Sequence, residues 1–276
     1  MKTGVSMTFK DWWTNENNPS LPKSQYMWSA RHIIMLIIAI GAAVAFSIIF
    51  YKKSERAKII LLKVFAYILL FFELLSRLVN LIIETDFSFR RIFEIIMPLH
   101  ICSVAVWCLI IGILFVRKKF LLNFTCIVGL LATVAFLLFP AVGINRTYIS
   151  YTCLYSISAH TIGFVCAILL MTLGFVKFRF KEIWQVLVCF AAMFLWGVIV
   201  DFLILPGADY MYLRNDPLEL NLSFPYHILY LIIILAYISL FYLVPLIKNK
   251  ILDFKHKKAE NLQENNKNDT KNAENE

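Results

Sequence analysis

The chain has 276 residues, of which 60% are hydrophobic and only 16% charged, whereas about a quarter of the residues of a soluble domain are charged. This composition excludes an ordinary soluble enzyme, and we expect an integral membrane protein whose length is taken up by membrane spans. The formal charge of +9 lies in short basic clusters between apolar runs, a pattern typical of cytoplasmic loops and not of nucleic-acid binding.

The first 30 residues combine Trp and Tyr side chains with lysines, asparagines and prolines, and they contain no apolar stretch like that of a secretory signal. Amphipathic aromatic side chains favour the membrane–water interface. We therefore expect residues 1–30 to form an interfacial segment on the extracytoplasmic side, anchored by Trp12, Trp13, Tyr26 and Trp28.

Seven apolar runs follow, each of about 20 residues or more, which suffices to cross a hydrocarbon core of about 30 Å at 1.5 Å per residue. They cover residues 33–51, 58–83, 96–116, 120–140, 152–176, 182–206 and 224–247. Because a bilayer offers no water to backbone polar groups, spanning segments without alternating polarity should be helices. The expected fold is all-α, a bundle of seven transmembrane helices formed by residues 31–248.

Basic residues are denser in the loops after the first, third and fifth runs, and after the seventh run, than in the other loops. The positive-inside rule then places the N-terminus outside and the C-terminus in the cytoplasm. Residues 249–276 should form a tail that is first basic and then disordered. The dense clusters are Lys52, Lys53, Arg56 and Lys58; Arg117, Lys118 and Lys119; Lys177, Arg179 and Lys181; and Lys248, Lys250, Lys255, Lys257 and Lys258.

Polar and ionisable side chains within the spans gather near the outer ends of five of the runs. Such groups are costly in a bilayer, so each of them is a hypothesis for a functional site. Their common depth predicts a polar cavity that opens toward the outer leaflet. Its candidate lining residues are Arg77, Asn80, His100, Cys102, His160, Asp201 and His227.

Two stripes of polar residues should each lie on one helical face. On the second run, the spacing is four, three and four residues for Glu73, Arg77, Asn80 and Glu84. Glu73 and Arg77 suit an ion pair that either locks this helix to its neighbours or forms part of a substrate-binding site. On the fifth run, the spacing is three and four residues for Cys153, Ser156 and His160, which form the second stripe.

His100, Cys102 and Ser103 lie within four residues at the start of the third run. A His within reach of a Cys or Ser is the minimum set for a nucleophile with a general base, and it also suits hydrogen bonding to a lipid head group. On a helix His100 and Cys102 are about 200° apart, so both can face one cavity only if Pro98 distorts the turn. A metal site is disfavoured, because no spacing motif supports one.

The loop between the sixth and seventh runs, residues 206–225, mixes aromatic and turn-forming residues. It is expected to form either an ordered lid or an interfacial loop whose tyrosines anchor in the head groups. Its candidate binding residues are Asp209, Tyr210 and Arg214.

Three motifs in this chain resemble those of the YwaF-type integral membrane proteins of bacteria. They are Trp-Ser-x-x-His (Trp28 to His32), Pro-Leu-His-Ile-Cys (Pro98 to Cys102) and Asp-Tyr-Met-Tyr-Leu-Arg-x-x-Pro (Asp209 to Pro217). That family is similar to a vertebrate seven-pass family implicated in transferring polyunsaturated acyl chains onto ether phospholipids. The resemblance implies a catalytic role for His160. The Cys of the vertebrate pattern is replaced here by Leu99, and Cys102 lies one turn further along the same face.

Two functions follow as expectations. The first is an intramembrane lipid acyltransferase or hydrolase with Cys102, or Ser103, as nucleophile. His160 would then be the general base, His100 would orient or stabilise an oxyanion, and Arg77 would hold a head group. The second is a non-enzymatic transporter or receptor that binds a small polar ligand in the same cavity. Membrane lipids are the expected partners, with no cofactor and no nucleic acid, in a bacterial plasma membrane.

Overall fold

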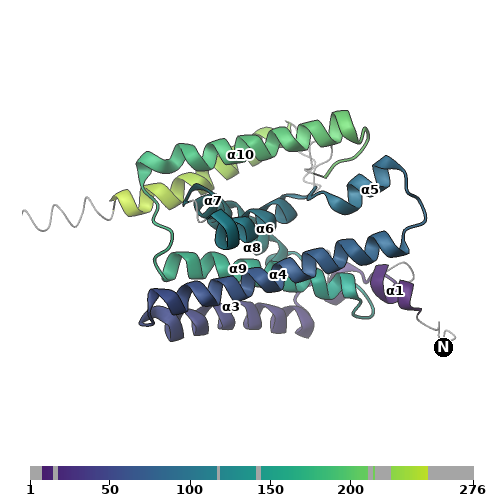
Figure 1. Ribbon diagram of the computed structural model, residues 1–276, viewed down its shortest axis with the longest axis horizontal. Coiled ribbons are helices and arrows are strands. Elements are labelled where there is room, and N and C mark those ends of the chain that lie inside the picture. Colours follow the sequence, from purple (N-terminus) through teal and green to yellow (C-terminus); the bar gives the residue numbers. More distant parts are fainter. Residues whose placement is uncertain are drawn as a thin grey trace, which may run out of the picture. The chain divides into compact units, whose positions relative to one another are not determined.

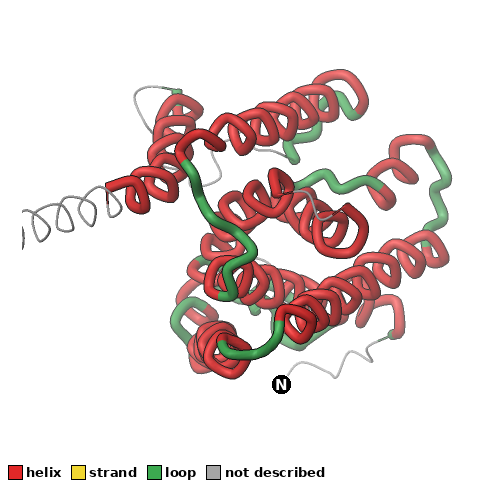
Figure 2. Tube along the Cα trace, turned by 60° about the vertical axis from the view of Figure 1, so that its left-hand side comes forward, coloured by secondary structure: helices red, strands yellow, loops and turns green. Residues whose placement is uncertain are grey.

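The computed structural model describes residues 8–14, 18–116, 119–140, 144–210, 214 and 225–247, and these residues are almost entirely helical (Figures 1 and 2). Six helices are long and apolar enough to cross a membrane, and a bent pair of helices brings the total to seven if the pair counts as one span. The predicted all-helical membrane fold is confirmed. The orientation of the termini stays a prediction, and the expected tail at residues 249–276 lies outside the described residues.

The spans begin and end close to the predicted positions, and several consist of more than one helical segment. They are α3 (Ala30–Tyr51); α4 (Glu55–Ile83); α7 (Lys119–Phe124), η2 (Thr125–Gly129) and α8 (Leu130–Leu138); α9 (Tyr151–Thr172); η3 (Phe180–Glu182), α10 (Ile183–Val198) and η4 (Ile199–Ile204); and the helix Tyr226–Ile247. Serine side chains fix several helix starts, because each accepts a hydrogen bond from a backbone N–H of the first turn. These N-caps are Ser29, Ser54, Ser88 and Ser150.

The third span is broken near its start. α5 (Phe89–Ile96) and α6 (Ile101–Ile111) meet at an angle of 56°, and η1 (Gly112–Val116) continues α6. The break contains Pro98, which has no backbone N–H to donate to a helix and disfavours helical geometry in the residue before it. The apolar run that begins at Ile96, the last residue of α5, therefore resumes as a helix only from Ile101 onward.

The chain divides by its internal contacts into two compact units, Met1–Lys177 with Gln185–Asn221, and Phe178–Trp184 with Leu222–Glu276. In the first unit, α9 packs against α3, α4 and α8 (Figure 1). In the second unit, the Phe178 ring meets the rings of Phe241 and Tyr242 at centroid distances of 5.2 and 5.5 Å. The candidate residue His227 also belongs to the second unit, where its ring stacks on that of Tyr226.

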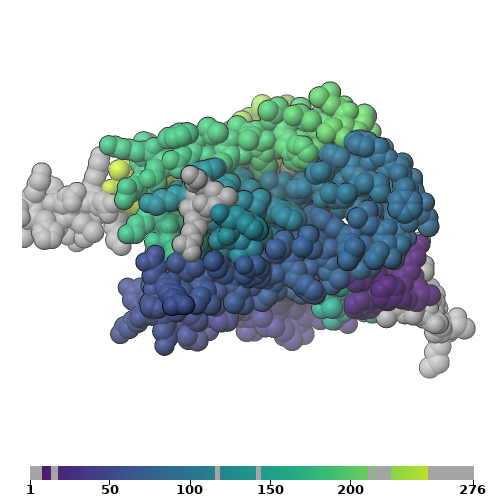
Figure 3. Space-filling model, viewed as in Figure 1, coloured from purple at the N-terminus to yellow at the C-terminus, as the bar shows by residue number. Residues whose placement is uncertain are grey.

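The N-terminal segment packs against the helix ends of the first unit. Its helices are α1 (Phe9–Thr14) and α2 (Lys23–Tyr26). The Trp13 ring stacks on the Tyr151 ring at 3.7 Å, and Trp13 Nε1 donates to Asn80 Oδ1 at 3.1 Å. Figure 3 shows this purple segment against the blue chain of α4. Trp28 is exposed as an interfacial anchor would be, whereas Trp13 is buried and acts as a packing residue.

His32 is a fully buried histidine with both ring nitrogens bonded. Its Nε2 lies 2.7 Å from the Leu137 carbonyl oxygen, and its Nδ1 accepts from the Trp28 N–H at 3.0 Å. The second bond holds Trp28 at a φ of 56°, a left-handed conformation that a non-glycine residue adopts only when it is supported. This histidine joins α3 to the end of α8, so its role is structural.

We expect His32→Ala to lower the free energy of unfolding by about 2 kcal/mol or more, because it leaves a cavity and a buried carbonyl without its donor. Denaturant unfolding in mixed micelles measures the change. Ile37→Ala, on the same helix at a side chain that is 64% exposed, is the control and should cost less than about 1 kcal/mol. Equal effects of the two substitutions would contradict the structural role.

Candidate functional site

The break in the third span places Cys102, the strongest nucleophile among the candidate residues, at the start of α6. His100 is the N-cap of α6, and Cys102 is its second residue. The first N–H groups of a helix have no acceptor within the helix. The backbone N–H groups of Cys102 and Ser103, together with the Ser103 side chain, interact with the Cys102 sulfur. The sulfur therefore lies where a helix favours negative charge.

A fully buried carboxylate, Glu73 on α4, joins three helices of the first unit. Its Oε2 accepts from Arg77 NH1 and, at 2.9 Å, from Trp107 Nε1 on α6. Its Oε1 accepts from the Tyr155 hydroxyl on α9. The predicted ion pair between Glu73 and Arg77 is confirmed. We call Glu73, Arg77, Trp107 and Tyr155 the Glu73 cluster.

Arg77 also supports the break in the third span. Its Nε donates to the Ile96 carbonyl at 2.9 Å, and its NH1 donates to the Glu73 carbonyl at 3.1 Å. The guanidinium lies 5.2 Å from the centre of the Trp107 ring. The last residue of α5 is thereby held against α4, and the position of the α6 start depends on this contact.

Cys102 lies beside the Glu73 cluster. Its thiol interacts electrostatically with the Glu73 carboxylate and with the Tyr155 hydroxyl. Within the part of the chain that the structure describes, no hydrogen bond joins this thiol to His100 or His160.

His160 is held by its own helix. Its Nδ1 lies 2.7 Å from the Ser156 carbonyl oxygen, and its ring stacks on Phe136 at 3.8 Å. A carbonyl oxygen can only accept, so the proton of the neutral imidazole is on Nδ1 and Nε2 carries a lone pair. Within the described ranges no hydrogen bond reaches Nε2, in contrast to His32, where both nitrogens are bonded.

His100 faces a different part of the first unit. Its Nδ1 lies 3.1 Å from the Tyr210 carbonyl oxygen, and the two rings meet edge to face. Asp201, which is fully buried on η4, accepts from the Tyr210 N–H at 3.2 Å and interacts electrostatically with His100. Leu99 packs against Val200 and Leu205 in the same region. The end of η4 therefore closes over the break in the third span.

The loop after η4 is ordered where the structure describes it. Gly207 turns the chain at a φ of 95°. Arg214 NH2 donates to the Asp201 carbonyl at 2.8 Å, and its guanidinium lies 4.4 Å from the centre of the Phe202 ring. The Arg214 N–H donates to Asp209 Oδ1 at 2.9 Å. Residues 211–213 and 215–224, which include the rest of the expected lid, lie outside the described residues.

The candidate residues thus form two groups in the first unit. Cys102 interacts electrostatically with the Glu73 cluster and lies beside Ser103, and His100 lies with Asp201, Tyr210 and Arg214. Asn80 bonds Trp13, while the Ser156 carbonyl holds His160. A cavity shared by all of them stays a prediction. Among the described residues, no group of three or more His, Cys, Asp or Glu side chains is placed to hold a metal ion.

Sequence reasoning missed Trp107 and Tyr155. A signal for them was present, because a buried carboxylate needs more donors than one arginine supplies. Tyr155 follows Tyr151 by one helical turn, and the two rings stack at a centroid distance of 6.4 Å. Any donor-bearing aromatic residue facing α4 was therefore a candidate partner of Glu73.

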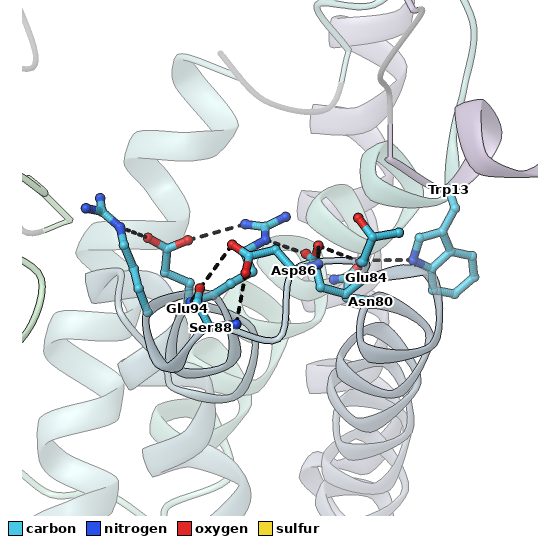
Figure 4. Close-up of polar contacts among 9 residues, drawn as sticks. Trp13, Asn80, Glu84, Asp86, Ser88 and Glu94 are labelled. Atoms are coloured by element: carbon cyan, nitrogen blue, oxygen red, sulfur yellow. Dashed lines mark hydrogen bonds and ion pairs between the residues drawn. The ribbon is translucent and has the colours of Figure 1, made fainter.

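A second polar network joins the end of α4 to α5 (Figure 4). Glu84 pairs with Arg91, and Arg91 and Arg90 both pair with Glu94. Hydrogen bonding from the Asp86 N–H, and then from the Arg91 side chain, lowers the pKa of Glu84 to about 2. The ionised Glu84 thus fixes the turn that carries α5 toward the break.

Comparison with known proteins gives a match to one family. The family model described as the TMEM164 family matches residues 27–244 of the 276. No curated protein and no solved structure matches the chain.

The lowered pKa of Glu84 predicts a pH-dependent contribution to stability. A carboxyl whose folded-state pKa is depressed stabilises the fold fully above its ordinary value of 4.5, and this contribution is lost as the pH falls toward about 2. Glu84→Gln should therefore lower the melting temperature most above pH 4.5, and its difference from the wild type should shrink toward pH 2. Thermal unfolding in detergent at a series of pH values measures this, with Glu182→Gln as control. A difference that does not change with pH would contradict the assignment.

Proposed function

The chain belongs to the TMEM164 family, a family of integral membrane proteins, and we propose that it is an intramembrane acyltransferase or hydrolase that acts on membrane phospholipids. The observation that carries the proposal is the position of Cys102 as the second residue of α6, where backbone N–H groups face its sulfur. A helix N-terminus is one of the settings in which a cysteine thiol is activated as a nucleophile. The resemblance to YwaF-type proteins, and through them to the vertebrate acyltransferase family, supports phospholipid as the substrate class.

The first half of the reaction transfers an acyl chain to the enzyme. The Cys102 sulfur attacks the carbonyl carbon of a phospholipid ester and forms a carbon–sulfur bond. The negative charge on the carbonyl oxygen is then stabilised by backbone N–H groups at the start of α6, those of Cys102 and Ser103. Cleavage of the ester carbon–oxygen bond leaves a thioester on Cys102. The leaving oxygen takes up the proton that the thiol gave up, and a lysophospholipid with a neutral hydroxyl is released. Ser103, one residue further on, is the poorer nucleophile because a hydroxyl ionises less readily than a thiol.

In the second half of the reaction, His160 acts as the general base. Its Nε2 lone pair accepts the proton of the incoming hydroxyl, which attacks the thioester and releases Cys102 as a thiol. When the hydroxyl belongs to a lysophospholipid, the result is acyl transfer, and when it belongs to water, the result is hydrolysis. The contrast with His32 supports this role, because a structural histidine in the same chain has both nitrogens bonded.

The charged residues around the break suit head-group binding. Nε and NH1 of Arg77 bond to protein groups, while its NH2 keeps donors for a phosphate. Asp209, Tyr210 and Arg214 form the described part of a lid whose closed position depends on the bond between His100 and the Tyr210 carbonyl. In this assignment His100 orients the lid above the start of α6.

Lipid mass spectrometry on purified protein in nanodiscs of defined phospholipids tests the proposal. We expect acyl exchange or free fatty acid from the wild type, and a loss of at least about 100-fold in Cys102→Ala and His160→Ala, because each removes a reacting group. Cys189→Ala on α10 is the matched control and should retain full turnover.

Undiminished turnover by folded Cys102→Ala protein would refute the proposed nucleophile. If neither the wild type nor any variant shows turnover, and thermal unfolding verifies that each is folded, the proposed enzymatic activity is refuted. That result would favour a transporter or receptor with a small polar ligand.

A further inference from the structure

Two arginines at the N-terminal end of α3, Arg31 and Arg146, have no acidic partner within the part of the chain that the structure describes. The ion pairs of that part lie on α4, on α5 and in the turn between them. Arg31 NH1 donates to the Arg146 carbonyl oxygen at 3.4 Å, so the two residues are neighbours. A guanidinium has five N–H donors, and most of those of this pair remain for a ligand.

We propose that Arg31 and Arg146 bind the phosphate of an anionic phospholipid whose acyl chain lies along α3. The phospholipid belongs to the leaflet that meets the N-terminal end of α3, which is the outer leaflet in the predicted orientation. Arginine suits this ligand because its planar fork of donors matches the oxygens of a phosphate. The site includes no residue of the break in the third span, and it does not depend on the proposed reaction.

The N-terminal segment holds Arg146 in place. Ser20 and Arg146 form an antiparallel bridge, and the Leu21 N–H donates to the Asn145 carbonyl at 2.7 Å. Arg146 NH1 donates to the Asn18 carbonyl at 2.8 Å and to Ser20 Oγ at 2.7 Å. These bonds leave Nε and NH2 of Arg146 for a phosphate. A side chain that is already ordered loses less conformational entropy when a ligand binds.

The length of α3 places Arg31 at the level of the lipid head groups. The helix has 22 residues and is about 33 Å long at 1.5 Å per residue, slightly more than a hydrocarbon core of about 30 Å. Arg31 is its second residue. Trp28, three residues earlier, is 60% exposed, and exposed tryptophans favour this level of the membrane. Phosphate is therefore the anion that the Arg31 guanidinium meets at this depth.

Below Arg31, the same face of α3 is apolar and exposed. Arg31, Ile34 and Ile38 are spaced three and four residues apart, which puts them on one face of the helix. Ile34 is 56% exposed and Ile38 is 58% exposed. α3 packs against α9 and lies at the edge of the first unit (Figure 1). A phosphate joined to an acyl chain thus fits the whole stripe, whereas a soluble phosphate would contact only its charged end.

The charge of the site favours an anionic head group. A zwitterionic phospholipid carries a cation of its own close to the phosphate, which repels two arginines that have no acidic partner. An anionic phospholipid has no such cation, and basic residues near a membrane surface attract it. We therefore expect the site to bind phosphatidylglycerol more tightly than phosphatidylcholine.

Native mass spectrometry of the full chain measures this affinity without any turnover. Phosphatidylglycerol is titrated into micelles that contain phosphatidylcholine, and the apparent Kd of the first bound phosphatidylglycerol is followed. We expect Arg31→Gln to raise this Kd by at least about 10-fold, because the variant loses charge-assisted hydrogen bonds to the phosphate. The matched control is Arg90→Gln, which removes an arginine whose side chain is 59% exposed but paired with Glu94, and it should leave the Kd unchanged.

An equal rise of the Kd in Arg31→Gln and Arg90→Gln would show a general effect of surface charge and overturn the site. An unchanged Kd in Arg31→Gln would overturn it as well. Arg146→Gln should weaken binding to a similar extent, but it also removes the bonds to the N-terminal segment. Arg31 is exposed, so Arg31→Gln decides the question alone if Arg146→Gln does not fold.

A competition experiment distinguishes the lipid from a soluble phosphate compound. Glycerol phosphate, which carries the phosphate without an acyl chain, is added at the concentration of the phosphatidylglycerol. We expect the bound phosphatidylglycerol to stay in place, because the soluble compound makes no contact with Ile34 and Ile38. Displacement by glycerol phosphate would overturn the lipid site in favour of a soluble ligand.

Photocrosslinking in nanodiscs of mixed phosphatidylglycerol and phosphatidylcholine tests the path of the acyl chain. With p-benzoylphenylalanine in place of Ile34, the share of phosphatidylglycerol among the lipid adducts should exceed its share in the nanodisc. The control position is Ile40, which is 53% exposed and lies about 120° around α3, and its adducts should match the nanodisc composition. The same composition at both positions, or adducts at Ile34 to a second copy of the chain, would overturn the placement.

Discussion

The buried carboxylate of Glu73 is the interaction on which the rest of the first unit depends. An isolated charge at this position would be costly, because neither lipid nor the packed interior solvates it. Its two oxygens are satisfied by Arg77 from the same helix, Trp107 from α6 and Tyr155 from α9. Removing one donor would leave a charged group only partly compensated, which typically costs several kcal/mol. The cluster therefore fixes the arrangement of α4, α6 and α9.

The same cluster determines where α6 begins. Arg77 holds the carbonyl of Ile96, Pro98 prevents helical continuation, and the chain resumes as α6 at Ile101. A helix start, with its unpaired N–H groups, is thus placed within a span and beside Cys102. On the other side of the break, the bonds between His100, Tyr210 and Asp201 hold the following loop over it. The chemistry that we propose depends on this break, because an unbroken helix would have no unpaired N–H groups beside Cys102.

Much of this architecture was predictable from the sequence. The apolar runs gave the spans to within a few residues, because hydrophobic length is a strong constraint in a bilayer. Helical spacing predicted the Glu73–Arg77 pair. The same spacing predicted that His100 and Cys102 point in different directions. The partners supplied by other helices were not predictable. Spacing along one helix specifies a face but does not say which neighbouring helix that face meets.

The N-terminal segment shows the same limit. Its aromatic residues indicated the membrane interface, and Trp28 is indeed exposed, but Trp13 packs on Tyr151 instead. Both positions carry the same residue type, and only the tertiary contact distinguishes them. The break at Pro98 could be anticipated as a distortion, whereas its 56° angle depends on the Arg77 contact with Ile96.

Trapping the acyl-enzyme is the most direct test of the proposed two-step reaction. If His160 serves the incoming hydroxyl, His160→Ala protein should still form the thioester and fail to release it. After incubation with a phospholipid that carries an isotope-labelled acyl chain, we expect the label to accumulate on the Cys102 peptide and to be removed by hydroxylamine. Folded His160→Ala protein that carries no label on Cys102 would contradict the proposed roles of Cys102 and His160.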